Sequence, residues 1–373
     1  MAGIYIHIPY CKQACHYCDF HFSTNLKTKP DLIGAICSEI KLRDNYLSSN
    51  KINTIYFGGG TPSMLTSPEL EAILRAVYEQ FEVSGKAEIT LEANPDDLSD
   101  ENLKNFRSQG INRLSIGIQS FNDSFLKKFN RAHTADMAKE AVDKARIAKF
   151  DNISVDLIFG IPDQSLSEFK DDLQKVIGLN PEHVSIYGLT IEENTVFGKW
   201  EKSKKLKPID EEIAAQQFEL IMDYLPEAGF RQYEVSNFCR EGYESRHNSS
   251  YWDGKEYLGV GPSAHSFNGK TRQYNITNNM KYIHSIAKGE IPCEVEVLSK
   301  TDRINEYILT KIRTEPGICF EEMKSRFGFN FEKIYEEKIK YYRNTGLILT
   351  NDRLVLTKAG RLVADAITAS FIS

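Results

Sequence analysis

Short apolar runs alternate with longer amphipathic stretches through the first half of the chain. The apolar runs cover residues 3–8, 52–57, 87–92, 113–119, 153–158 and 183–187. Stretches between them, such as 68–78, 100–107 and 134–148, carry apolar residues at helical spacing. This alternation predicts repeated β/α units around a parallel sheet. We therefore expect an α/β fold, an incomplete (β/α)6 barrel, with functional groups at the C-terminal ends of its strands.

The pattern changes twice further along the chain. A helix predicted near 210–228 leads into a region of different composition, and helical periodicity returns from about residue 301. A hairpin-like stretch at 347–356 then precedes a last helix, as in a winged-helix module. No dense basic recognition helix accompanies it, so we expect packing or partner binding there rather than DNA binding.

These changes divide the chain into three expected parts. They are a partial barrel (1–200), a connecting region (201–300) and a C-terminal winged-helix-like α+β domain (301–373).

Three cysteines follow the first apolar run at a C-x3-C-x2-C spacing: Cys11, Cys15 and Cys18. Thiolates are soft ligands, and a tight loop with three of them suits zinc or an iron–sulfur cluster. The next cysteine, Cys37, lies in a predicted helix, so no fourth thiol stands close by.

Two hypotheses follow for this loop. A neighbouring histidine could complete a structural zinc site. Alternatively, the three cysteines hold three irons of a 4Fe-4S cluster and leave the fourth iron open to another ligand. The histidines that enter the first hypothesis are His7, His16 and His21.

Polar residues occur late in three of the apolar runs: Glu92, Gln119 and Asp156. A buried carboxylate is costly unless it is paired or hydrogen-bonded. Any one of these residues could be a satisfied strand end, but three on successive strands beside a metal loop predict a shared polar pocket.

A glycine run, Gly58-Gly59-Gly60-Thr61-Pro62, ends the second predicted strand. Consecutive glycines permit close approach of a ligand, and their N–H groups could bind a carboxylate. The alternative is a tight turn between strand and loop. No Gly-Lys-Ser/Thr follows, so this is not a phosphate-binding P-loop.

A histidine next to aromatic residues stands out in the connecting region, in the segment 246–252 (RHNSSYW). His247 could be an axial haem ligand. It could equally be a core histidine packed among its aromatic neighbours.

Composition narrows the class of protein. The chain has 373 residues, 41% of them apolar, and a formal net charge of -6, which does not suggest a general nucleic-acid-binding surface. No apolar run reaches the length of a membrane span, and the N-terminus lacks a secretory signal. Seven cysteines, three of them clustered, favour a reducing compartment over a disulfide framework. We expect a cytoplasmic protein.

Taken together, these motifs resemble the radical S-adenosylmethionine (SAM) superfamily over nearly the whole chain. The cysteine loop is typical of the superfamily, and its combination with the glycine run, Glu92, Gln119, Arg131 and Asp156 is typical of one branch. That branch contains the oxygen-independent coproporphyrinogen III dehydrogenases and the HemW-type haem chaperones.

The resemblance implies two cofactors and their residues. Cys11, Cys15 and Cys18 would bind the 4Fe-4S cluster, and SAM would chelate the open iron. Arg131 can fork onto a carboxylate, and Glu92 or Asp156 can accept from an ammonium or a ribose hydroxyl. The positions that match SAM contacts in the family are Tyr5, Tyr17, Gly59, Gly60, Thr61, Glu92, Gln119, Arg131 and Asp156.

Two features separate the members of the branch. The dehydrogenases carry another cysteine two residues after the third, where this chain has Phe20, and an extension before the first strand, which here begins at Gly3. The segment from His247 to Trp252 matches the H-N-x-x-Y-W motif of the chaperone type. The resemblance thus places His247 in a haem-binding segment.

The function implied is that of a haem chaperone, which delivers haem to a haem-dependent respiratory enzyme. No residue is assigned a catalytic role, and whether the protein is an enzyme stays open. Peripheral docking at a membrane and homodimer formation are compatible with this function. The alternative is radical decarboxylation of coproporphyrinogen III, in which one electron cleaves SAM to a 5′-deoxyadenosyl radical.

Overall fold

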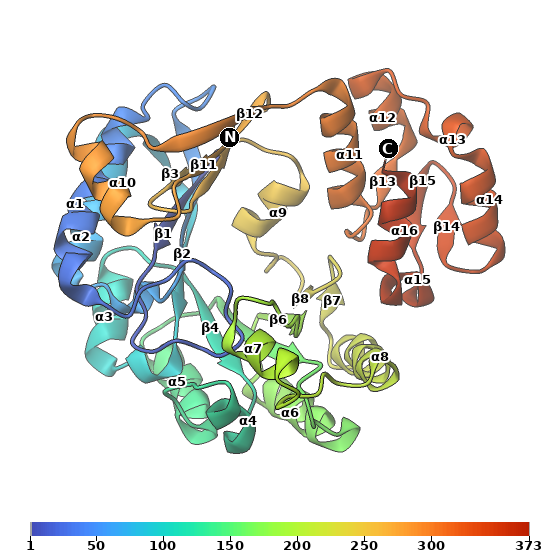
Figure 1. Cartoon of the computed structure of the whole chain (residues 1–373), viewed down its shortest axis with the longest axis horizontal. Coiled ribbons are helices and arrows are strands. Elements are labelled where there is room, and N and C mark those ends of the chain that lie inside the picture. Colours follow the sequence, from blue (N-terminus) through green and yellow to red (C-terminus); the bar gives the residue numbers. More distant parts are fainter. Residues whose placement is uncertain (1, 373) are drawn as a thin grey trace.

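A large mixed sheet forms the main body of the computed structural model, which describes residues 2–372 (Figure 1). Among those residues, twelve strands follow the order β12-β11-β10-β9-β1-β2-β3-β4-β5-β6-β8-β7. Its six central strands are parallel, which confirms the predicted incomplete barrel. They are β1 (Ala2–Ile8), β2 (Lys51–Gly59), β3 (Glu82–Ala93), β4 (Arg113–Gln119), β5 (Ile153–Phe159) and β6 (His183–Gly188).

Helices follow the parallel strands along the chain, as the periodicity predicts. Residues that alternate along β1 explain the packing: Ile4, Ile6 and Ile8 are fully buried in the main core, while Tyr5 and His7 line the opposite face. The helices are α1 (Lys29–Leu42), α2 (Ser67–Gln80), α3 (Asp100–Ser108), α4 (Asp123–Lys128), α5 (Ala135–Ile147), α6 (Leu166–Leu179), α7 (Val196–Lys202) and α8 (Glu211–Glu227).

Several helices begin at residues that cap the free N–H groups of the first turn. Ser165 and Glu168 form a capping box at the start of α6, and Thr66 and Glu69 form another at α2. These capping residues fix where the helices predicted from the periodicity begin.

The region expected to connect two domains extends the main sheet instead. Strand β9 pairs in parallel with β1, and β10, β11 and β12 continue from it as antiparallel neighbours. The boundaries at residues 200 and 300 stay a prediction. Elements of this region are β7 (Arg231–Gln232), β8 (Asn237–Cys239), α9 (Arg246–Trp252), β9 (Tyr257–Val260), β10 (His265–Phe267), β11 (Thr271–Asn275), α10 (Asn279–Ala287) and β12 (Cys293–Val297).

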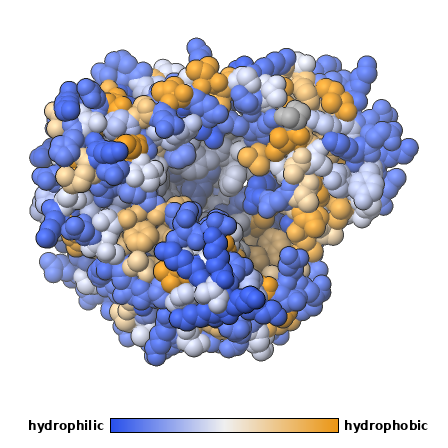
Figure 2. All heavy atoms as spheres, in the orientation of Figure 1, coloured by the Kyte–Doolittle hydropathy of each residue, from blue (hydrophilic) through white to orange (hydrophobic). Residues whose placement is uncertain are grey.

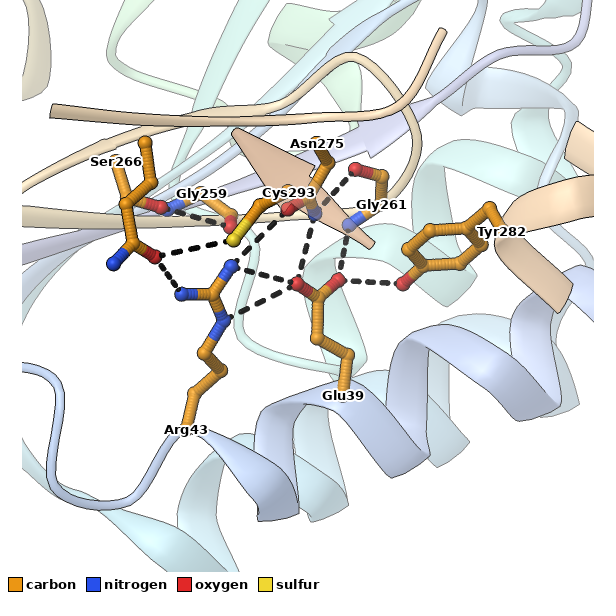
Figure 3. Close-up of polar contacts among 9 residues, drawn as sticks. Glu39, Arg43, Gly259, Gly261, Ser266, Asn275, Tyr282 and Cys293 are labelled. Atoms are coloured by element: carbon orange, nitrogen blue, oxygen red, sulfur yellow. Dashed lines mark hydrogen bonds and ion pairs between the residues drawn. The ribbon is translucent and has the colours of Figure 1, made fainter. Parts of the chain in front are cut away.

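A buried ion pair joins this extension to the first helix (Figure 3). Glu39 of α1 pairs with Arg43 at 3.3 Å and accepts hydrogen bonds from the Gly261 amide (2.8 Å) and the Tyr282 hydroxyl (2.5 Å). Arg43 in turn donates to Asn275 of β11 at 3.1 Å. Because every partner is buried, the cluster fixes the loop after β9, the end of β11 and helix α10 relative to α1.

The C-terminal residues form a smaller unit with its own apolar core. A three-stranded antiparallel sheet, ordered β13-β15-β14, packs with helices and confirms the predicted α+β module. Figure 1 shows α9 between the main sheet and this unit. Its elements are α11 (Lys300–Lys311), β13 (Ile318–Cys319), α12 (Phe320–Phe327), α13 (Phe331–Ile334), α14 (Glu336–Asn344), β14 (Ile348–Thr350), β15 (Arg353–Leu356), α15 (Lys358–Leu362) and α16 (Ala364–Phe371).

Figure 2 shows that the surface is hollowed near the centre of the same view, between the sheet and the C-terminal unit. Across residues 2–372, no helix combines the length and apolarity needed to span a bilayer.

Candidate functional site

The three clustered cysteines lie in the loop that follows β1, and each is partly buried. Backbone contacts hold the loop in place: the Cys11 amide donates to Ser23 O at 3.1 Å, and the Cys18 amide donates to Cys15 O at 3.3 Å. Across the site, Asn130 Nδ2 donates to Ala14 O at 2.7 Å. The loop is therefore tied to the end of α4.

Two donors from other elements point at the cysteine sulfurs. Thr61 Oγ1 lies 3.4 Å from Cys11 Sγ, and Arg131 Nη1 lies 3.5 Å from Cys15 Sγ. Burial raises the pKa of the Cys18 thiol to about 11. Donors of this kind stabilise sulfur that carries negative charge, as a metal-bound thiolate does.

The zinc hypothesis finds no support in the described residues. Among residues 2–372, no three His, Cys, Asp or Glu side chains converge to hold a single metal ion. The three histidines have other partners: His16 Nδ1 contacts Lys128 O at 2.9 Å, His7 Nε2 contacts His21 O, and His21 Nε2 contacts Asn279 Oδ1. A cluster presents a separate iron to each thiolate and does not require such convergence, so the donor set fits 4Fe-4S better than zinc.

Glu92 lies at the end of β3 and is held by two donors. The Tyr56 hydroxyl donates to Oε1 at 2.8 Å, and the Gly59 amide donates to Oε2 at 3.2 Å. Burial raises the pKa of Glu92 to about 7, and the charge of Asp156 acts in the same direction. The two predicted carboxylates thus influence each other across the sheet.

Asp156 receives hydrogen bonds from serines on two strands. Ser115 Oγ of β4 lies 3.1 Å from Oδ2, and Ser154 Oγ of β5 lies 3.2 Å from Oδ1. Burial raises the pKa of this carboxyl as well. Both carboxyl groups accept hydrogen bonds and are removed from water. Burial disfavours their negative charge, and a cationic ligand would compensate for that cost.

Arg131 links the cysteine loop to the ends of the strands. Its Nη2 donates to Asn94 Oδ1 at 2.6 Å and to Gly117 O at 2.7 Å, while Nη1 faces Cys15. Its Nε is buried and finds no acceptor within the described residues. That free donor leaves Arg131 able to bind a carboxylate.

Gln119 ends β4 in a left-handed conformation, with φ of 70°. A Cβ atom built on Gly117 would lie 2.8 Å from Gln119 Nε2 and 3.5 Å from Arg131 Nη2. The absence of a side chain at Gly117 therefore leaves room for both predicted residues at one point.

The two tyrosines occupy different surroundings. The Tyr5 hydroxyl contacts His7 Nδ1 at 3.2 Å, and its ring stacks on Tyr56 at 6.1 Å. Tyr17 packs edge-on against Phe129 at 4.9 Å, beside a small apolar cluster. Tyr5 faces the barrel interior, and Tyr17 supports the cysteine loop.

The glycine run packs closely against β1. Gly59 has φ of 108°, and a Cβ atom there would lie 2.6 Å from the His7 ring. The Gly59 amide is bound to Glu92 and the Gly60 amide to Ile8 O at 2.9 Å. Neither N–H is free for a ligand, so the geometry favours the tight-turn explanation of this run over carboxylate binding by these two amides.

His247 is fully buried under the N-terminal halves of β1 and β2. Its Nδ1 contacts Thr54 Oγ1 and its Nε2 contacts the Tyr251 hydroxyl, both at 2.8 Å, and its ring stacks on Tyr56 at 5.1 Å. Burial lowers the pKa of His247 to about 3, with Arg113 adding to the effect. Both nitrogens are occupied, so this ring could bind iron only after losing both contacts.

A cavity of about 720 Å³ opens between the main sheet and the C-terminal unit. The rest of the His247 motif reaches it, because Tyr251 and Trp252 line its wall and His247 does not. Its volume lies within the usual range for ligand pockets, about 300–1,000 Å³. Aromatic lining residues are Tyr5, Phe20, Tyr251, Trp252, Tyr257, Phe267 and Tyr307.

Two residues of the barrel and cavity were missed in the sequence. Arg113 is only 1% exposed, and its Nε and Nη1 find no acceptor among the described residues. The sequence could have indicated Arg113, because it is a charged residue in an apolar run, like Glu92. His265 lines the cavity, and although it lies in the region of different composition, no motif marks it as a ligand.

Family comparisons match both parts of the chain. Residues 5–176 match the model of the radical SAM superfamily, and residues 298–363 match the HemN C-terminal domain.

Relatives and a solved structure match over almost the whole length of the chain. "Heme chaperone HemW" of Lactococcus lactis subsp. lactis (strain IL1403) is 39% identical, over 94% of this chain and 91% of the relative. "Heme chaperone HemW" of Bacillus subtilis (strain 168) is 32% identical, over 100% of this chain and 99% of the relative. Coproporphyrinogen III oxidase (HemN) from Escherichia coli, a radical SAM enzyme, shares the fold with a TM-score of 0.86 at 21% identity, over 100% of this chain and 90% of that chain.

Proposed function

The chain belongs to the HemW family of haem chaperones within the radical SAM superfamily, and we propose that it binds haem and delivers it to a haem-dependent respiratory enzyme. The observation that carries this proposal beyond family membership is the 720 Å³ cavity with seven aromatic lining residues. A flat apolar macrocycle gains most from such walls. Peripheral docking at a membrane and a homodimer both fit delivery of this kind.

The cluster and SAM belong to the same proposal. Cys11, Cys15 and Cys18 would hold the 4Fe-4S cluster, which together with SAM would supply one-electron chemistry at a sulfonium when bound. Thr61 and Arg131 stabilise the sulfurs of Cys11 and Cys15 by hydrogen bonds.

For SAM, the chain supplies a guanidinium beside the cysteine loop, on Arg131, and two carboxyl groups on strands β3 and β5, those of Glu92 and Asp156. Arg131 would receive the carboxylate, and Glu92 and Asp156 would receive the ammonium or ribose hydroxyls. Tyr5, Tyr17, Thr61 and Gln119 complete the proposed contacts, and Gly59 and Gly60 would permit close approach of SAM without donating their amides, which are bound within the protein.

The cluster loop also reaches the cavity. Asp19 and Phe20, which follow Cys18 directly, line the cavity wall, as do Tyr5 and His7 of β1. A structural change at the cluster or at SAM could therefore alter the position of bound haem through these residues, because they belong both to the cluster loop or β1 and to the cavity wall. This contact supports a role of the cluster in haem transfer.

The second candidate is decarboxylation of coproporphyrinogen III, which the shared fold with the E. coli oxidase keeps under consideration. Phe20 argues against it. The side chain is 74% exposed at the cavity, in the position where the dehydrogenases carry an additional cysteine. This chain offers no thiol there.

A transfer assay tests the proposed function. The protein, anaerobically reconstituted and loaded with haem, is mixed with the haem-free form of a respiratory haem enzyme in detergent. We expect the haem absorption of the chaperone to decline while acceptor activity appears, faster than from free haem at the same concentration. Transfer no faster than from free haem would contradict delivery.

A further inference from the structure

The two walls of the cavity differ because histidines line the side of the sheet and its loops, while the described lining residues of the C-terminal unit include arginines and no histidine. The sheet extension supplies His265 and Phe267 of β10 and Arg272 of β11, while the C-terminal unit supplies Arg303 and Tyr307 of α11. Asymmetric walls of this kind orient an asymmetric ligand. Haem is such a ligand, with an iron at its centre and two propionates along one edge.

Three histidines line the cavity, and they differ in their free nitrogens. His7 uses both nitrogens, on the Tyr5 hydroxyl (3.2 Å) and His21 O (3.1 Å). His21 uses Nε2 on Asn279 at 2.7 Å. Among the described residues, neither ring nitrogen of His265 has a hydrogen-bond partner, and its side chain is exposed to the cavity.

The backbone that carries His265 is rigid. Ser266 Oγ bridges the amide and carbonyl of Gly259 at 2.9 and 3.1 Å, and Gly259 lies so close that a Cβ atom there would be 1.9 Å from His265 O. The buried Glu39 cluster holds the preceding loop at Gly261. A ligand on a fixed strand keeps its direction.

The ring of His265 is also in a suitable chemical state. It packs against Tyr274 at 5.5 Å, which steadies one side of the ring. Burial and the charge of Arg272 lower the pKa of His265, so the ring stays neutral near pH 7. Neutral imidazole is the form that binds iron.

Cations on the opposite wall are available for carboxylates. Arg303 forms no ion pair with any described residue, and among those residues its side chain makes one hydrogen bond, from Nε to Ser299 O at 3.4 Å. Arg326 pairs with Glu322 at 3.5 Å, with both side chains more than 40% exposed. Such a surface pair is weak, about 0–1 kcal/mol, so Arg326 can exchange its partner.

We propose that haem lies in this cavity with its iron bound by His265 and its propionates by Arg303 and Arg326. The proposal rests on the proposed haem-binding function and specifies it. It gives the H-N-x-x-Y-W segment a different role from iron ligation: Tyr251 and Trp252 form part of the wall, and His247 positions Tyr251 from behind.

The iron ligand is tested by ferric haem titration of His265→Ala and His265→Gly, with His284→Ala as the matched control. His284 is exposed on α10 and does not line the cavity. We expect the haem affinity of both His265 variants to fall by more than about tenfold and the Soret band and EPR spectrum to change. Added imidazole should restore the wild-type spectrum in His265→Gly, and His284→Ala should match wild type.

The outcomes separate this proposal from the function on which it rests. Wild-type protein that binds no haem at saturation would contradict the proposed function. Wild-type protein that binds haem, with His265 variants of unchanged affinity and spectrum, would overturn only the ligand assignment. Iron and sulfide content, measured on each variant, verifies that the cluster loop is intact.

The propionate contacts are tested with haem dimethyl ester, which lacks the two charges. Wild type should bind the ester about 10–100-fold more weakly than haem, because charge-assisted hydrogen bonds are lost. The double variant Arg303→Ala/Arg326→Ala should bind both ligands with similar affinity. Arg343→Ala, an exposed arginine of α14 outside the cavity, should behave as wild type. A double variant that still prefers haem as strongly as wild type would contradict the assignment.

Discussion

Glu92, which we propose contacts SAM, shows how the protonation of one residue depends on its surroundings. Its two oxygens accept from Tyr56 and Gly59, which favour the charged form, but burial and Asp156 outweigh them. The folded protein therefore holds this proton more tightly than the unfolded chain does. A carboxyl with a pKa of about 7 is poised to lose its proton when a cation arrives.

Replacement of Glu92 by Gln should change how stability depends on pH. The pKa of Glu92 in the folded protein, about 7, lies above its ordinary value of 4.5. This carboxyl therefore favours folding below pH 4.5, and the contribution is lost as pH rises through 7. We expect the unfolding free energy of SAM-free wild type, relative to Glu92→Gln, to decline by up to about 3 kcal/mol between pH 4.5 and 8. Urea unfolding of both proteins at each pH measures this difference, and a flat difference would refute the raised pKa.

The sequence motif drew attention to His247, but the surroundings of this residue could not be predicted. The motif located an aromatic-rich segment, and the structure places Tyr251 and Trp252 at the cavity. That the ring of His247 turns inward, onto Thr54 and Tyr251, depends on contacts with strands about 190 residues earlier in the chain. Of the two explanations left open in the sequence, the geometry favours the core histidine.

His247→Ala should weaken haem binding without changing the iron ligand. Loss of a buried ring and two hydrogen bonds should destabilise the fold by about 2–4 kcal/mol. We expect lower haem affinity, because Tyr251 loses its support, but an unchanged Soret maximum for the haem that binds. Tyr251→Phe keeps the aromatic ring and loses only the hydrogen bond to His247, so we expect a smaller loss of haem affinity. A spectrum altered as in His265→Ala would instead favour His247 as ligand.

At the scale of elements, the six parallel strands and their helices were predictable because each carries a strong local pattern. The strands β9 to β12 were not predicted, although they lie in the region of different composition that follows residue 228. These strands are three to five residues long, and β12 is largely exposed, so no apolar alternation reveals them. Strand β9 alone among them pairs with β1, and that pairing joins residues about 250 positions apart, which no local pattern reveals.

The Glu39–Arg43 pair should contribute strongly to the stability of this extension. Glu39→Ala leaves Arg43 buried without its carboxylate, which should cost about 3–5 kcal/mol in unfolding free energy. Glu79→Ala is the control, because Glu79 pairs with Lys41 at 3.8 Å on the surface and should cost about 0–1 kcal/mol. Equal effects in urea unfolding would contradict the role assigned to the buried cluster.

At the scale of the whole molecule, the cavity is assembled from segments far apart in sequence. Residues 5–21, 251–277 and 303–326 each supply part of its wall. Sequence motifs pointed to the cysteine loop and to several polar residues proposed to contact SAM, because these residues lie at or near the strand ends of one sheet. The cavity could not be predicted, because it depends on where the C-terminal unit sits against the sheet.

The most direct test of the account is a haem titration of the anaerobically reconstituted protein, with coproporphyrinogen III turnover measured on the same sample in the presence of SAM and reductant. The account predicts saturable haem binding with a histidine-ligated spectrum and no decarboxylated product. Decarboxylation without stable haem binding would contradict it, and would mean that Phe20 and the H-N-x-x-Y-W segment do not distinguish a chaperone from a dehydrogenase.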